Sequence, residues 1–184
     1  MDSTIWVILA VVAIVVVFVW TLYNSLVTAK VRIQEAWSGI DVQLKRRTDL
    51  IPNIVASVKG YAAHEKEVFE NVTKARSALL SAQTVGEKGQ ADTMLSGALK
   101  SLFAIAEAYP QLLANENFLQ LQNELSDVEA KIAYARQFYN ANVMDYNTKI
   151  KVFPNMLLAS TFGFQEEEFF QADQAERQPV KVQF

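Results

Sequence analysis

The single histidine of the chain, His64, stands beside Glu65 and is the first residue whose type suggests catalysis or metal binding. A helical zinc site needs a second histidine four positions further on, but that position holds Val68. A di-iron bundle needs two Glu-x-x-His elements, and a catalytic triad built on this histidine needs a serine on a glycine-rich turn, which the sequence lacks. The absence of cysteine excludes disulfides and thiolate ligands. We therefore expect no catalytic residue, metal or cofactor, and we place His64 on a helix surface.

Three charged residues, Arg47, Glu65 and Arg136, lie on or beside apolar stripes of expected helices. One interpretation is an anion site or a general acid/base pair. The other is a buried or half-buried ion network that fixes helix register, since a charge in a protein core is costly unless it is paired. We favour the structural interpretation, in which Glu65 faces the core and requires a partner.

Two Tyr-Asn pairs, Tyr139-Asn140 and Tyr146-Asn147, repeat one heptad apart and so share one helix face. A ligand groove is one interpretation. The preferred one is that the tyrosines pack with their hydroxyls reaching outward, while Asn140 and Asn147 set register or bond a neighbouring helix end. The run Glu166–Glu168 is interpreted as solvated surface without a ligand.

These residues must be positioned by a chain whose most distinctive segment is Ile5–Tyr23, in which every residue but Thr21 is apolar. A helix of this length spans about 28 Å, close to the hydrocarbon core of a bilayer. Trp6 lies near one end, and Trp20 and Tyr23 lie near the other, where amphipathic rings favour the membrane interface. The segment is predicted to be a transmembrane helix preceded by a short exported N-terminus, residues 1–4.

A cleaved signal peptide is the alternative, because Val27–Ala29 offers small residues for cleavage. A signal peptide has a basic stretch before a shorter apolar core, whereas only Asp2 precedes this one. Retention is therefore favoured. Lys30, Arg32 and residues 45–47 are basic and follow the span, which predicts an outside N-terminus and a cytoplasmic bundle in a bacterial inner membrane.

The rest of the chain is predicted to be all-α. A net charge of -3 and a pI of 5.3 argue against nucleic-acid binding. The span is expected to continue as a helix to Arg47, and Asp49 with Pro52 is expected to start the next one. Thr84–Ala91 is expected to be an exposed turn. Heptad-like apolar stripes then predict an elongated antiparallel up-and-down four-helix bundle, similar to a coiled coil, with helices over residues 5–47, 50–83, 92–108 and 118–150.

The predicted bundle domain covers residues 24–170 and is followed by a flexible tail, residues 171–184. Phenylalanines are concentrated near its end. Either they cap the open end of the bundle or they form a docking patch for another subunit or the membrane surface. The five residues are Phe153, Phe162, Phe164, Phe169 and Phe170.

Several motifs in order resemble the LemA family, from the anchor to about Phe170. They are Tyr23-Asn24 with Leu26-Val27, the run from Glu35 to Asn53, the segment from Lys59 to Glu65, the segment from Ala135-Arg136 to Tyr146-Asn147, and Phe153-Pro154. The resemblance implies a bacterial single-span membrane protein with a helical bundle, and it implies no reaction. Some relatives are associated with membrane metalloproteases and others with membrane compartments such as magnetosomes.

Two functions follow as hypotheses. The first is a non-enzymatic scaffold that forms homo-oligomers and organises or shapes the bilayer. The second is an adaptor for a membrane protease or an envelope-stress system. An enzyme using carboxylates is the least favoured alternative, because it would require a concave pocket that gathers charged groups.

Overall fold

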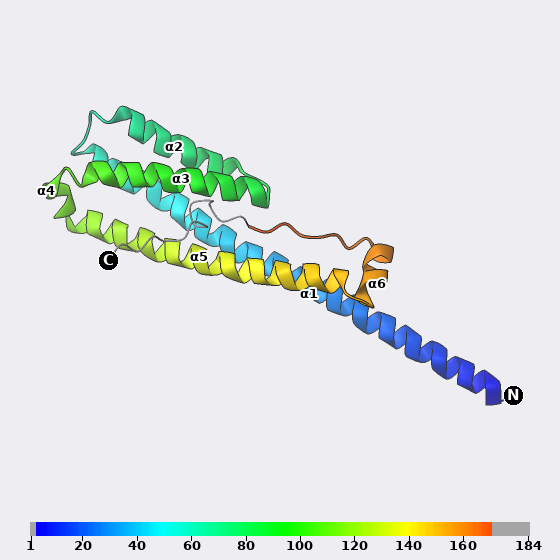
Figure 1. The fold of residues 1–184 in the computed structure, drawn as a ribbon. Helices are drawn as coiled ribbons and strands as arrows, with labels where there is room; N and C mark the ends of the chain where they lie inside the picture. The colour runs from blue at the N-terminus through cyan, green and yellow to red at the C-terminus, as the bar shows by residue number, and fades with distance from the viewer. Residues whose placement is uncertain (1–2, 171–184) are drawn as a thin grey trace, which may run out of the picture. The chain divides into compact units, whose positions relative to one another are not determined.

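The computed structural model describes residues 3–170, which contain six helices and no strand (Figure 1). The predicted all-α fold is therefore confirmed for this part of the chain. The predicted tail, residues 171–184, and the first two residues lie outside it. The helices are α1 (Ser3–Lys59), α2 (Lys66–Ser81), α3 (Val85–Ala106), α4 (Pro110–Leu113), α5 (Glu116–Lys151) and α6 (Asn155–Phe162).

The described residues group into two compact units. The first contains residues 3–37 and 138–168, and the second contains residues 38–137 and 169–170. The long helices α1 and α5 contribute residues to both units. Each unit has its own buried side chains, so each is described separately.

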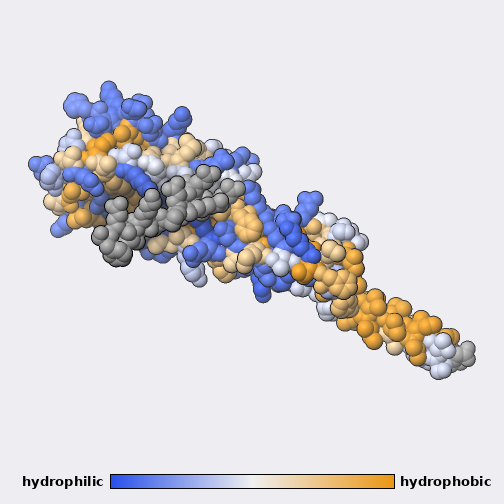
Figure 2. All heavy atoms as spheres, in the orientation of Figure 1, coloured by the Kyte–Doolittle hydropathy of each residue, from blue (hydrophilic) through white to orange (hydrophobic). Residues whose placement is uncertain are grey.

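In the first unit, the N-terminal part of α1 is apolar over the face shown in Figure 2, and α1 contains no charged residue before Lys30. Its most apolar window of 18 residues has none of its residues buried, and the helix is long and apolar enough to cross a membrane. Exposure of apolar surface to water is unfavourable by about 25 cal/mol per Å² relative to an apolar environment. Transfer of this surface into the hydrocarbon of a bilayer removes that cost. The first part of α1 therefore has the properties of a membrane anchor, as the sequence predicted.

In the second unit, segments of α1, α2, α3 and α5 pack around an aliphatic core. Ile40, Ile54 and Val58 of α1 are fully buried, as are Leu95 and Leu102 of α3. Their spacings of 14 and 4 residues along α1 and of 7 residues along α3 keep each stripe on one helix face. The ring of Phe103 on α3 lies 6.3 Å from that of Phe118 on α5. The stripes traced in the sequence thus correspond to the buried faces of these helices.

The predicted helix boundary at Asp49 is wrong, because α1 continues through Pro52 to Lys59. Proline has no N–H, so Pro52 cannot donate to the carbonyl of Thr48 four residues earlier. The Nε of Arg76 on α2 donates to this carbonyl instead, at 2.8 Å. A side chain from another helix thus satisfies the acceptor that proline leaves open, and α1 breaks at Gly60 rather than at Pro52.

The predicted turn at Thr84–Ala91 is also wrong, because α3 begins at Val85 and includes both glycines of this stretch. The Thr84 hydroxyl accepts a hydrogen bond from the Glu87 amide at 3.2 Å, and the Glu87 carboxylate accepts one from the Thr84 amide at 3.1 Å. This capping box starts the helix. Hydrogen bonds from the Gln83 and Thr84 amides lower the pKa of Glu87. The cap therefore outweighs the low helix propensity of glycine here.

The Arg76–Thr48 contact predicts a double-mutant effect. Arg76→Ala leaves a half-buried carbonyl without its donor and should lower the free energy of unfolding by about 1–3 kcal/mol. In a Pro52→Ala background, residue 52 regains an N–H for the same carbonyl, so Arg76→Ala should cost less. Chemical unfolding of the four proteins, followed by circular dichroism, measures the coupling. Ser77→Ala is the control, and additive costs would contradict this account.

Candidate functional site

A buried carboxylate, Asp92 on α3, forms the centre of the most polar region in the second unit. Only 1% of its surface is exposed. Its Oδ1 accepts a hydrogen bond from Nη1 of Arg47 on α1 at 2.5 Å, and its Oδ2 accepts one from Nη2 of Arg136 on α5. One acidic side chain therefore joins three helices.

Arg47 makes two further hydrogen bonds through its second terminal nitrogen. Nη2 donates to Ser96 Oγ at 3.0 Å and to Glu129 Oε1 at 2.9 Å. The Ser96 hydroxyl in turn donates to the carbonyl of Asp92 at 3.0 Å. Arg47 is 3% exposed, so its charge depends on these partners rather than on water.

The aromatic ring of Phe170 covers the Arg136 side of the network. The guanidinium carbon lies 4.7 Å from the ring centroid, which is a favourable cation–π geometry. Phe170 is itself buried, with 1% of its surface exposed. The ring therefore restricts solvent access to this charge.

The network opens on a groove of about 580 Å³ between α3 and α5. Arg47, Asp92, Glu129 and Arg136 form its charged lining together with Lys100. Its remaining lining combines hydroxyl, amide and apolar groups from Thr93, Ser96, Leu99, Phe103, Gln122, Leu125, Ser126, Ile132 and Ala133. The second unit therefore has a concave surface of the size of a small ligand site.

The groove brings charged groups together, as an enzyme using carboxylates would require. Both oxygens of Asp92, however, already accept hydrogen bonds from guanidinium groups, and Glu129 is paired with Arg47. A general base must lie within hydrogen-bond reach of its substrate, and the Asp92 side chain is only 2% exposed. Within residues 3–170, no group of three His, Asp or Glu side chains is placed to hold a metal ion. The geometry of the network therefore suits pinning of helices better than proton transfer.

The sequence anticipated two members of this network and misplaced a third. Arg47 and Arg136 take part in it, whereas Glu65 is exposed, precedes α2 and makes no side-chain cap to that helix. The prediction that Glu65 faces a core is wrong, because the chain leaves α1 at Gly60 and no helix carries the stripe through residue 65. His64 is exposed in the same connection rather than on a helix.

Asp92 and Glu129 were not predicted. Asp92 begins a 3-4-3-4 pattern with Leu95, Leu99, Leu102 and Ala106, so its position in the buried stripe was readable. The expected helix began at residue 92, so this carboxylate stood at its boundary and was not assigned to the stripe. The error in the boundary therefore concealed the central residue.

The first unit contains a second polar cluster, in which α5 binds the extended chain that follows α6. The Asn147 side-chain amide donates to the carbonyl of Glu167, and its oxygen accepts from the Glu167 amide, both at 2.9 Å. The Tyr139 hydroxyl donates to the Glu168 carbonyl at 2.8 Å. Lys30 of α1 forms an ion pair with the Glu167 carboxylate at 3.1 Å. Asn147 therefore holds a backbone segment rather than a helix end, and Asn140 is half-buried on the same helix.

The two tyrosines of this cluster are buried, and their hydroxyls do not both reach outward as expected. Burial, with the nearby Glu167 and Glu168 carboxylates, raises the pKa of Tyr139 to about 12. Burial also raises the pKa of Tyr146, against the opposing effect of Lys30. The Tyr146 hydroxyl is buried without a hydrogen-bond partner.

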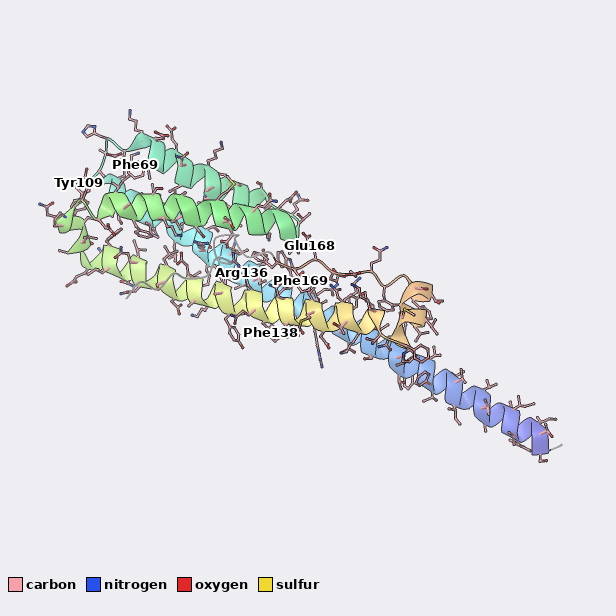
Figure 3. All side chains as sticks on the ribbon, in the orientation of Figure 1. Phe69, Tyr109, Arg136, Phe138, Glu168 and Phe169 are labelled. Atoms are coloured by element: carbon pink, nitrogen blue, oxygen red, sulfur yellow. The ribbon has the colours of Figure 1, made fainter. Side chains whose placement is uncertain are left out.

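The five phenylalanines near the end of the described chain are divided between the two units. In the first unit, Phe162 and Phe164 contact Tyr23 with ring centroids 5.1 and 5.8 Å apart, and Phe153 is exposed. In the second unit, Phe170 covers Arg136, and Phe169 is exposed (Figure 3). They therefore have at least three different environments.

The fold and this site define a class of protein, whose described residues are all-α: an N-terminal apolar helix long enough to cross a membrane, and a helical unit organised by a buried ion network. The sequence model of the LemA family matches residues 36–184, and the chain belongs to this family. Its Ser38–Gln137 core and the Asp92 network lie within the matched region.

Comparison with individual proteins agrees with this assignment. The chain is 28% identical to magnetosome protein MamQ 2 of Paramagnetospirillum magneticum, over 90% of this chain and 72% of that protein. It is 28% identical to magnetosome protein MamQ of Magnetospirillum gryphiswaldense, over 90% and 71%. It is 32% identical to protein LemA of Metamycoplasma hominis, over 85% and 72%. None of these names describes a catalytic activity.

The network predicts a large and selective loss of stability when its centre is removed. Asp92→Ala leaves two arginines without their shared partner and should lower the free energy of unfolding by about 3–5 kcal/mol. Glu129→Ala should cost no more than about 1 kcal/mol, because the Glu129 side chain is half exposed. Thermal and chemical unfolding of purified protein compares the two variants. A melting temperature unchanged by Asp92→Ala would contradict the structural role.

The pKa of Tyr139 predicts a loss of stability at alkaline pH. The folded chain holds the Tyr139 proton up to about pH 12, whereas a free tyrosine releases it near 10.0. This contribution to stability is therefore complete below pH 10.0 and is lost as the pH rises towards 12, by about 2–3 kcal/mol. Tyr139→Phe cannot ionise, so its free energy of unfolding should fall less across this range. Tyr134→Phe, at an exposed ring, is the control. An equal loss of unfolding free energy in the wild type and in Tyr139→Phe would contradict the assignment of this effect to Tyr139.

Proposed function

We propose that this LemA-family protein is a non-enzymatic, single-pass membrane protein that self-associates into a scaffold and so organises or shapes the bilayer. Residues 5–23 cross the bacterial inner membrane, with Trp6, Trp20 and Tyr23 at its interfaces. The N-terminus is outside and the helical bundle lies in the cytoplasm. The exposed apolar part of α1 and the names of the magnetosome relatives support membrane association.

An exposed aromatic side chain of the second unit, Tyr134 on α5, is the observation that carries self-association. It is 72% exposed, more than any other large apolar side chain among the described residues of that unit. Aromatic residues are enriched at protein interfaces because they bury a large area with few rotatable bonds. A second copy of the chain would cover this ring.

The charged network supports a structural rather than an enzymatic role. Its carboxylates are occupied by arginines, so an enzyme using carboxylates remains the weaker alternative. The groove beside the network is the observation that supports the second candidate function. This is an adaptor that binds a segment of a membrane protease or an envelope-stress protein. Either role leaves the Asp92 network to maintain the shape of the second unit.

Self-association is testable on the full-length protein extracted in a mild detergent. Sedimentation velocity over a dilution series should show oligomers that dissociate into monomers. Tyr134→Ser should weaken assembly about tenfold, equivalent to about 1.4 kcal/mol, because the variant removes apolar contact area. Tyr61→Ser, at an exposed tyrosine after α1, is the matched control.

Two outcomes would contradict this proposal. A wild-type protein that stays monomeric at every concentration would exclude self-association. Crosslinking in cells that recovers a different protein, and no second copy, would favour the adaptor. Unchanged assembly of the Tyr134→Ser variant would show that another surface is used.

A further inference from the structure

Helix α6 and the residues before it have an unusual surface within the first unit. From Val152 to Gln165 the chain carries no charged residue. Of the eight residues of α6, only Ala159 is buried. Large apolar side chains are exposed along this stretch: Val152, Phe153, Met156, Leu157 and Phe162. Such a density of exposed apolar groups indicates an interaction site.

Contacts inside the first unit place the end of α6 against the apolar part of α1. The Phe162 ring meets the Tyr23 ring edge to face, with centroids 5.1 Å apart. Phe162 also closes an apolar recess of about 410 Å³, whose other walls are Val15, Val16, Val19, Trp20 and Tyr23. These α1 residues belong to the second half of the predicted span, residues 15–23. The end of α6 therefore lies at the depth where that span leaves the hydrocarbon.

Basic side chains accompany the apolar ones in this unit. Lys149 and Lys151 are in the last turn of α5, immediately before the uncharged stretch. Both are partly exposed and also form ion pairs, Lys149 with Asp145 at 2.9 Å and Lys151 with Glu166 at 2.7 Å. Arg32 of α1 and Lys149 line a polar recess of about 260 Å³ together with Thr21, Ser25 and Thr28. Hydroxyl, ammonium and guanidinium groups near a membrane surface suit phospholipid headgroups. Apolar and basic groups together are typical of segments that lie in the interface.

We propose that residues 152–162 form an interfacial lipid-binding element, in which Phe153, Met156, Leu157 and Phe162 insert into the leaflet where Trp20 and Tyr23 reside. The element gives the protein a second attachment to the bilayer, beside its span. Lys149 and Arg32 face the headgroups of anionic phospholipids in the same leaflet. This inference rests on the proposed membrane anchoring by α1 and goes beyond it.

The chain contains no cysteine, so single-cysteine variants of the full-length protein can be labelled without a background. An environment-sensitive fluorophore is attached at Leu157→Cys, at Val12→Cys in the span, or at Met144→Cys on α5. Leu157 and Met144 are 58% and 61% exposed, so the second is a matched control in the same unit. Each variant is first checked for wild-type helicity and melting temperature. Each is reconstituted in vesicles of equal parts phosphatidylcholine and phosphatidylglycerol, with a nitroxide on a shallow acyl position.

The probes at 12 and 157 should both lose fluorescence to the nitroxide lipid, and the probe at 144 should not. Quenching at 12 with none at 157 would overturn the lipid-binding element and leave the anchor standing. No quenching at 12 would overturn the anchor, and with it the proposed function. An apolar spectrum at 157 that is not quenched, and that disappears on dilution with lipid, would instead identify a second copy as the occupant and overturn the inference.

Discussion

The burial of one carboxylate between two arginines is the constraint on which the second unit depends. Asp92 is surrounded by protein, so its charge is tolerable only while Arg47 and Arg136 stay in place. These residues come from α3, α1 and α5, and a shift of any helix by one turn would separate them by about 5 Å. Apolar stripes alone allow neighbouring registers, because leucine can replace leucine. The ion network removes that freedom.

Backbone hydrogen-bonding groups organise the protein in a second way, at places where the helix itself supplies no partner for them. Pro52 leaves the Thr48 carbonyl without an intrahelical donor, and Arg76 supplies one. In the first unit, the extended chain after α6 has no strand to pair with in the described residues, and Asn147 and Tyr139 bond its peptide groups. Polar side chains within apolar surroundings thus complete the hydrogen bonding of irregular backbone. Their positions are specific because an amide or hydroxyl must reach a particular peptide group.

Periodicity in the sequence predicted the long helices well. The repeat from Phe118 to Ile150 corresponds to α5, and the apolar run from Ile5 lies within α1. Local signals at helix ends were less informative. Asp49 and Pro52 resembled a helix start, yet the buried Ile51, Ile54 and Val58 continue the stripe across them. The packing energy of the whole buried stripe exceeds the cost of one proline inside the helix. A local sequence pattern does not show this, because the packing energy depends on contacts with other helices.

The sequence by itself determined which elements the protein contains. These are an apolar helix able to cross a membrane, helices with heptad-spaced apolar stripes, and two charges that require partners, Arg47 and Arg136. Tertiary structure alone decided which partners they have. Asp92 and Glu129 reach Arg47 from positions 45 and 82 residues away. Glu65, a nearer candidate, is exposed because the chain leaves its helix five residues earlier. Helical periodicity specifies which face a residue occupies, but ion pairing depends on distances between helices, which only their packing sets.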